Sequence, residues 1–167
     1  KNFNLINPGS YSDDDGVRTS PKTMAITNNC SEDKKLELRL DETNDSSLSP
    51  KNIKVYVNGE YDLQPTLLNN IKNITGTNNI KNTYRLLKFT IPSGTTKRLN
   101  FRMWLDEDAV TTDDRNSFYT KYYISDGELI TKLAAEDTII NNNGGEDSII
   151  AKGTPDYSNP ATTDEGL

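Results

Sequence analysis

Strict alternation of apolar and polar residues near the middle of the chain does most to limit the possible folds. From Leu99 to Leu105 every second residue is apolar, and Trp104 is a large exception among the residues between them. Period-two spacing places the apolar side chains on one face of a half-buried β-strand. The segment 84–91 alternates in the same way, and a Pro-Ser-Gly turn separates the two segments. The sequence therefore predicts adjacent antiparallel strands in a layered β domain.

Further alternating segments bring the expected number of strands to about seven, which is typical of a mainly β chain with an immunoglobulin-like or jelly-roll-like antiparallel β-sandwich. The dipeptide Asn58-Gly59 favours a type I′ turn and predicts a hairpin between the strands that flank it. In the strand over 35–40, the leucines are expected to face the core, with Glu37 and Arg39 facing solvent. The expected strands cover residues 3–6, 22–27, 35–40, 53–57, 61–63, 84–91, 98–105 and 118–124. The side chains expected to be buried are Leu36, Leu38, Leu40, Val55, Val57, Leu87, Phe89, Phe101, Met103 and Leu105.

The hydrophobic period changes after Gly127. Apolar residues between Leu129 and Ile140 fit the stripe of a short helix, which a Gly-Gly pair would end. The segment 148–152 fits either a helix or an extended strand. We therefore expect residues 1–126 to form the β-sandwich domain, and residues 127–167 to form a short helix and a linker-like tail.

Composition excludes several classes of function. The net charge of −6 argues against binding to nucleic acid or to an anionic membrane surface, which requires clustered Lys and Arg. The chain has no His, and its single Cys30 has neither a base to activate it nor partners for a zinc site. No apolar run reaches the roughly 20 residues that span a bilayer. We therefore expect a non-enzymatic protein, with Cys30 as a small buried hydrophobe.

Several motifs are distinctive beyond their strand pattern. The segment 102–109 reads RMWLDEDA, and a strand rich in tyrosine follows over 117–124. Together with the segments 19–30 and 143–167, these motifs resemble cell-surface proteins of Firmicutes-type bacteria, broadly the camelysins and biofilm-matrix fibre proteins. The resemblance implies a β-sandwich at the bacterial cell surface or in the extracellular matrix. It also implies self-association or contact with neighbouring surface modules.

Acidic turns supply the candidate metal ligands. Asp106, Asp108, Asp113 and Asp114 lie in one loop region and could offer oxygen ligands to Ca²⁺. The alternative is an acidic turn that protects a strand edge from aggregation. The segment 13–16, Asp-Asp-Asp-Gly, is similar to half of a calcium loop but has Tyr in the first ligand position, which favours a solvated turn. We expect no obligatory cofactor.

Aromatic residues offer a possible glycan-binding face. Trp104, Tyr119, Tyr122 and Tyr123 could stack against sugar rings, although aromatic residues in strands more often pack in a core. This alternative describes an adhesin or a carbohydrate-binding module of a larger surface protein. A virion or phage structural domain would share the same fold class.

The first residues are the candidate assembly site. Phe3, Asn4, Leu5 and Ile6 form a short alternating strand, and Pro8-Gly9 breaks the chain directly after it. Such a strand either closes the sheet of its own domain or completes the sheet of a neighbour by strand addition. The sequence therefore favours a structural module, possibly the protomer of a fibre.

Overall fold

The computed structural model describes residues 1–71, 73–75, 79–110, 116–126, 138–141 and 148–151. Within these residues the chain is mainly β, with one helix of a single turn, α1 (Asp13–Gly16), and 3₁₀ turns at Pro50–Asn52 and Leu68–Asn70. The strands are β1 (Leu5–Ile6), β2 (Ser10–Tyr11), β3 (Lys22–Asn28), β4 (Lys34–Thr43), β5 (Ile53–Gly59), β6 (Leu63–Leu67), β7 (Asn73–Thr75), β8 (Ile80–Ile91), β9 (Thr96–Asp106), β10 (Ser117–Phe118), β11 (Thr120–Ser125), β12 (Thr138–Asn141) and β13 (Ser148–Ala151).

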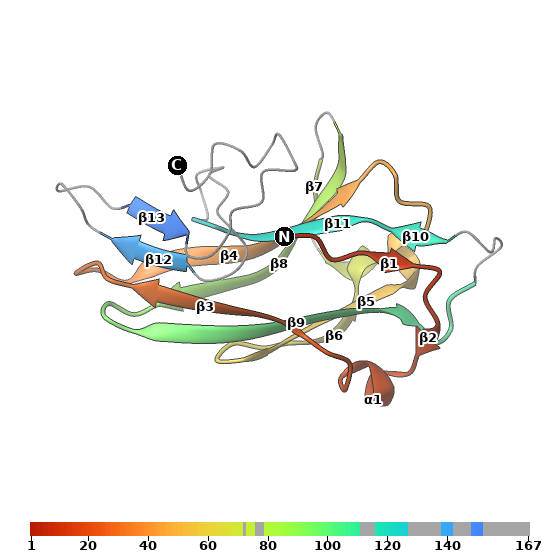
Figure 1. Cartoon of the computed structure of the whole chain (residues 1–167), viewed down its shortest axis with the longest axis horizontal. Helices are drawn as coiled ribbons and strands as arrows, with labels where there is room; N and C mark the ends of the chain where they lie inside the picture. Colours follow the sequence, from red (N-terminus) through yellow and green to blue (C-terminus); the bar gives the residue numbers. More distant parts are fainter. Residues whose placement is uncertain (72, 76–78, 111–115, 127–137, 142–147, 152–167) are drawn as a thin grey trace.

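Two larger sheets form the layers of the molecule (Figure 1). The four-stranded sheet has the order β11-β4-β8-β7, and the seven-stranded sheet has the order β13-β12-β3-β9-β5-β6, with β2 beside β9. Strands β1 and β10 form a short separate pair. The two sheets share one core, in which the rings of Phe101 in β9 and Tyr122 in β11 lie 5.5 Å apart. This arrangement is a sandwich-like β fold.

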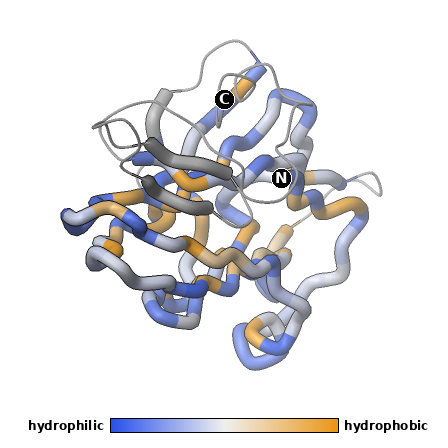
Figure 2. Tube along the Cα trace, turned by 60° about the vertical axis from the view of Figure 1, so that its left-hand side comes forward, coloured by the Kyte–Doolittle hydropathy of each residue, from blue (hydrophilic) through white to orange (hydrophobic). Residues whose placement is uncertain are grey.

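The core follows the predicted alternation closely. All the side chains expected to be buried are buried except Leu87, which is half-buried. Leu38 pairs with Leu87 but Arg39 pairs with Arg85, so Leu86 is an extra residue in a β-bulge. The bulge brings Leu86 into the core as well, beside the half-buried Leu87, which packs against the same core. Figure 2 shows the alternation as hydrophobic and hydrophilic residues that interleave along the strands.

The expected solvent face of β4 is buried. Glu37 and Arg39 are 2% and 6% exposed, and Asp41 on the same face is fully buried. The Glu37 carboxylate accepts a hydrogen bond from Arg39 Nε at 2.8 Å, and Arg85 from β8 donates to both of its oxygens. The prediction of an exposed face was wrong: the charged side chains of β4 are buried and paired, Glu37 with Arg39 of the same strand and with Arg85 of β8, and Asp41 accepts from the Tyr123 hydroxyl of β11.

The Asn58-Gly59 hairpin is confirmed, but its turn is longer than predicted. Asn58 and Gly59 remain paired with β9, and the chain turns over the three residues that follow before β6 begins. Gly59 has φ +120°, and a Cβ there would lie 2.5 Å from the carbonyl oxygen of Arg98. Glycine is therefore required by the close approach of β9 rather than by a two-residue type I′ turn.

Two strand pairings also differ from the expected all-antiparallel arrangement. β12 pairs with β3 in parallel, and β2 pairs with β9 in parallel. Ile139 and Ile140, which the apolar spacing placed in a helix, lie in β12. A short run of β-branched residues satisfies either pattern, and here pairing with β3 decides between them. The rest of the predicted helix lies outside the described residues.

The buried ion pairs of β4 predict a dependence of stability on pH. Burial raises the pKa of Glu37, but hydrogen bonds from Arg85 and Arg39 outweigh this effect and hold the pKa below its usual 4.5. Because the ionised form is favoured in the folded state, its contribution is complete at neutral pH and is lost as pH falls below about 4.5. We expect Glu37→Gln to lower the free energy of unfolding at pH 7 by about 3–5 kcal/mol, since it leaves buried arginine charge uncompensated.

Urea unfolding at pH 7 and pH 3 measures this effect, and the difference between wild type and Glu37→Gln should shrink at pH 3. Glu32→Gln is the matched control, because the exposed Glu32 lies 3.9 Å from Lys34 and such pairs contribute little. Equal losses in the two variants would contradict the assignment.

Candidate assembly site

Residues 1–7, which we call the arm, run antiparallel along one edge of β10 and β11. The amide of Phe3 donates to the carbonyl oxygen of Thr120 at 3.0 Å, and the amide of Tyr122 donates to the carbonyl oxygen of Lys1 at 2.9 Å. Leu5 pairs with Phe118 in β1 and β10. The arm therefore covers main-chain groups at the end of the four-stranded sheet that would otherwise form an open edge.

Alternate arm side chains point into the fold. Phe3 and Leu5 pack against the core, whereas Ile6 is 61% exposed. The Phe3 ring meets Phe101 of β9 edge-on at 5.2 Å, and the Lys22 ammonium lies 5.5 Å from the centre of the Phe3 ring. Phe3 thus contacts one sheet by its side chain and the other by its backbone. We call the space that it fills, between β9 and β11, the seam.

Thr120 is the central contact of the arm on β11. Its side chain is 1% exposed and its hydroxyl donates to the carbonyl oxygen of Phe3, while its amide donates to Asn4 Oδ1 at 3.2 Å. These bonds satisfy the polar groups of a buried residue. They also fix the register, so that Phe3 rather than a neighbouring residue enters the seam.

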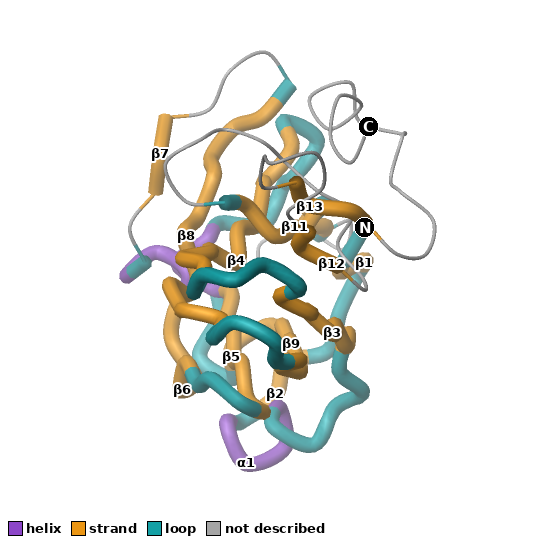
Figure 3. The backbone as a smooth tube through the Cα atoms, turned by 90° about the vertical axis from the view of Figure 1, so that its left-hand side faces the viewer, coloured by secondary structure: helices purple, strands orange, loops and turns teal. Residues whose placement is uncertain are grey.

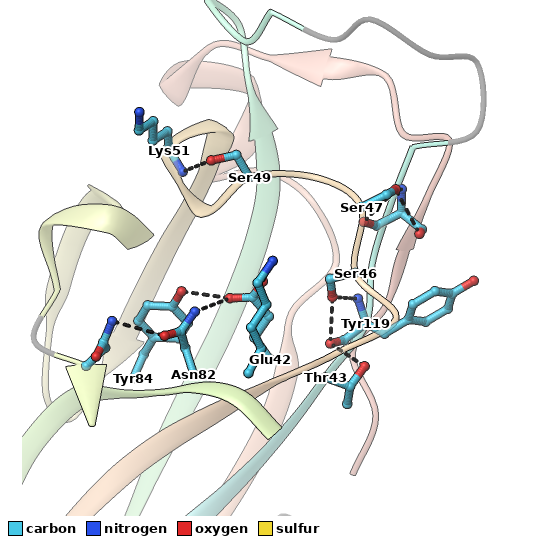
Figure 4. Close-up of polar contacts among 12 residues, drawn as sticks. Glu42, Thr43, Ser46, Ser47, Ser49, Lys51, Asn82, Tyr84 and Tyr119 are labelled. Atoms are coloured by element: carbon cyan, nitrogen blue, oxygen red, sulfur yellow. Dashed lines mark hydrogen bonds and ion pairs between the residues drawn. The ribbon is translucent and has the colours of Figure 1, made fainter. Parts of the chain in front are cut away.

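The other edge of β11 pairs with β4, and β10 and Tyr119 are held by the end of β4 and the loop that follows it (Figure 4). Tyr119 donates its amide to Ser46 Oγ at 2.8 Å, and the carbonyl oxygen of Tyr119 accepts from the amide of Thr43 at 3.0 Å. The carbonyl oxygen of Ser117 accepts from the amide of Leu48 at 2.8 Å. The receiving strand is therefore bound to its own domain on one side and offers its other side to the arm.

A hinge joins the arm to the body. Asn7 has φ +45°, a left-handed conformation that asparagine tolerates better than most residues, and Pro8 and Gly9 follow it. The chain is fixed again directly after the hinge, because β2 pairs with β9. The amide of Asn7 still donates to the carbonyl oxygen of Asn116 at 2.7 Å, so among the described residues main-chain bonding is interrupted only at Pro8 and Gly9, between the arm and β2.

On the body side of the hinge, the chain is anchored by residues 12–19, which we call the strap. The strap includes α1 and lies close to β2 and β9 (Figure 3). Lys54 Nζ lies 3.1 Å from both carboxylate oxygens of Asp13. Arg102 Nε donates to the carbonyl oxygen of Thr19 at 2.7 Å, and Gly16 lies directly against the buried Trp104. The strap thus holds the body side of the hinge in place.

A buried carboxylate that sequence reasoning missed ties β4 to β8 (Figure 4). Glu42 is fully buried, and its Oε1 accepts from Tyr84 Oη at 2.8 Å and from Asn82 Nδ2 at 3.1 Å. Burial and the Glu42 hydrogen bond raise the pKa of Tyr84 above its usual value. Asp41 plays a similar part for Tyr123, whose hydroxyl donates to it at 3.0 Å. These residues fix strand pairing, and their only sequence signal was their position at the end of a strand pattern.

The candidate metal ligands are only partly placed by the structure. Asp106 ends β9, and its carbonyl oxygen accepts from the amide of Ala109 in the turn that contains Asp108. Asp113 and Asp114 lie outside the described residues. Among the residues that the structure describes, no three Asp, Glu, Cys or His side chains are grouped as metal ligands would be. Asp13, the first residue of the Asp-Asp-Asp-Gly segment, lies in the strap and forms an ion pair with Lys54 of β5.

The aromatic candidates do not form a common surface. Trp104, Tyr122 and Tyr123 are each 1–2% exposed. Tyr122 faces the shared core, whereas Tyr123 bonds to Asp41 on the opposite face of its sheet, and Trp104 lies under the strap. These rings pack inside the protein and are not available for stacking on a sugar. Cys30 is also buried, as expected.

Comparison with known proteins assigns no family: no family model matches the sequence, and no curated protein or solved structure is significantly similar to it. Among the described residues, no helix is long and apolar enough to span a bilayer. The arm, the hinge and the seam are therefore the basis for a functional assignment.

Proposed function

We propose that this chain is a non-enzymatic structural module of a bacterial surface or matrix protein, and that it associates with further copies by exchange of the arm. In the exchanged form the arm leaves its own seam and fills the seam of the next copy. The contacts formed are the same in both forms, so exchange costs little beyond the change at the hinge. Each copy donates one arm and receives one, which permits a fibre.

One observation carries the proposal: a strand bound largely by main-chain hydrogen bonds and by Phe3 is joined to the body at Asn7 by an exposed hinge. Main-chain bonds make such a strand transferable between identical copies. An extracellular location agrees with the acidic surface and the sequence motifs that resemble surface proteins.

Shortening the hinge tests the proposal. Deleting Pro8 and Gly9 should prevent the arm from reaching its own seam while leaving it long enough to reach another copy. We expect the shortened chain to form oligomers that light scattering and electron microscopy detect. A chain with Gly-Ser-Gly inserted after Gly9 should remain monomeric under the same conditions.

Deleting the arm in the shortened chain is the decisive control, because it removes the donor but leaves the seam. We expect this double deletion to be monomeric and less stable than wild type, since burial of Phe3 is lost. Oligomers that persist without the arm would refute exchange. A shortened chain that stays monomeric would refute it as well.

A further inference from the structure

The main-chain ladder between the arm and β11 contains one substitution. Lys1 and Tyr122 exchange two main-chain bonds, of 3.3 Å and 2.9 Å, as the residues of a regular antiparallel pair do. Two residues further along each strand, Phe3 and Thr120 are placed to form the next such pair. The amide of Phe3 donates to the carbonyl oxygen of Thr120 at 3.0 Å, but the amide of Thr120 donates to Asn4 Oδ1 at 3.2 Å. A side chain of the arm thus accepts a bond that the main chain of the arm usually accepts.

Thr120 needs this acceptor because it is buried. Thr120 is 1% exposed, and its hydroxyl already donates to the carbonyl oxygen of Phe3, the usual acceptor for its amide. Asn4 lies on the exposed side of the arm, since Phe3 and Leu5 pack against the core, and its Oδ1 reaches back to the Thr120 amide. Removal of this acceptor would leave a buried donor unpaired, which opposes seating of the arm by a factor of about ten or more.

This bond makes recognition of the arm depend on its sequence. Main-chain bonds accept any extended segment, whereas the amide of Thr120 requires a short side chain with a carbonyl oxygen, which only Asn and Asp have. Such a side chain directly follows an aromatic residue at two places in the chain, Phe3-Asn4 and Tyr61-Asp62. The ring of Tyr61 is already packed against Phe89, with 5.1 Å between the ring centres. The arm is therefore the segment of this chain that can supply both groups to the seam.

We propose that Asn4 determines which donor the seam accepts. The donor is an extended segment in which Asn or Asp directly follows the aromatic residue that fills the seam, because other apolar strands leave the Thr120 amide unpaired. For a donor from another copy the inference rests on the proposed arm exchange, and it makes a second copy of this chain the preferred partner over other extended segments. The same rule governs seating of the arm in its own seam, so a monomer can test it.

Amide hydrogen exchange of the full chain, followed by NMR, tests the rule without transfer of arms between copies. The amides of Phe3 and Tyr122 bond across the arm and β11, so they exchange with solvent when the arm opens. We expect both to exchange about tenfold faster in Asn4→Leu, which keeps the size of the side chain but removes the acceptor. In Asn4→Asp, which retains an acceptor oxygen, they should exchange close to the wild-type rates.

Asn2→Leu is the matched control. Asn2 is also an exposed residue of the arm, and its side chain makes no hydrogen bond with the residues that the structure describes. The control should leave both rates unchanged. Equal rates in Asn4→Leu and wild type, equal effects of the two leucine substitutions, or rates in Asn4→Asp as fast as those in Asn4→Leu would overturn the proposal.

Selection between copies is measured in the chain shortened by deletion of Pro8 and Gly9. Adding Asn4→Leu should raise about tenfold the protein concentration at which oligomers form, and adding Asn2→Leu should not change it. Oligomers that form at the same concentration with and without Asn4→Leu would overturn selection of the donor. A shortened chain that stays monomeric with Asn4 in place refutes arm exchange itself, and hydrogen exchange in the full chain then decides the role of Asn4 alone.

Discussion

Replacing Phe101 with alanine is expected to lower the free energy of unfolding by about 3–5 kcal/mol, the usual cost of removing a buried aromatic ring. Phe101 is fully buried, and it contacts Phe3 of the arm and Tyr122 of the opposite sheet. The substitution therefore opens a cavity where both sheets and the arm meet. Chemical unfolding followed by circular dichroism measures the loss.

A double-mutant cycle then separates the arm from the core. Phe3→Ala removes the edge-on ring contact from the arm side, and the combined variant should be less destabilised than the sum of the two single variants. We expect a coupling of about 0.5–1.5 kcal/mol, as for other aromatic pairs. Strict additivity would show that the Phe3 and Phe101 rings do not interact, and an unchanged stability of Phe3→Ala would show that the arm has no apolar anchor in the seam.

Replacing Gly16 with alanine is expected to destabilise the strap. A Cβ at this position would lie 2.2–2.6 Å from ring atoms of Trp104, which is 1% exposed. Because neither the ring nor the helical turn has free space, we expect a loss of about 1–3 kcal/mol. Trp104 is the single tryptophan of the chain, so its fluorescence should shift to longer wavelength as the ring gains solvent.

Gly9→Ala is the control for this substitution. A Cβ at Gly9 meets no atom within 4 Å, and Gly9 does not have a positive φ. We expect its stability and its fluorescence to match wild type. If Gly16→Ala also matched wild type, the strap would not be packed on Trp104.

The period-two pattern predicted the strands and most of the core because the alternation within a half-buried strand indicates which of its side chains are buried. It failed where burial had another cause. Glu37 and Arg39 looked like a solvent face, but they are buried as mutually compensating charges, a property of strand order that no local pattern contains. Trp104 is buried by a helical turn more than 80 residues away in sequence, which local spacing likewise cannot indicate.

The candidate site was predictable in part. The sequence predicted a short alternating strand over residues 3–6, and the structure places its alternate residues Phe3 and Leu5 against the core. The partner of that strand was not predictable, since pairing with β10 and β11 joins residues more than 100 positions apart. The role of Thr120 depends on this pairing and had no signal of its own.

Strand β4 of the four-stranded sheet has neither a free edge nor an exposed central face. β4 is bonded to β8 along one edge and to β11 along the other, and its seven consecutive residues from Leu36 to Glu42 are buried on both faces. Such a strand cannot detach by local fraying, as chain ends do. It separates from its neighbours only in global unfolding. The arm can therefore open and close repeatedly while β4 and the rest of the core stay folded.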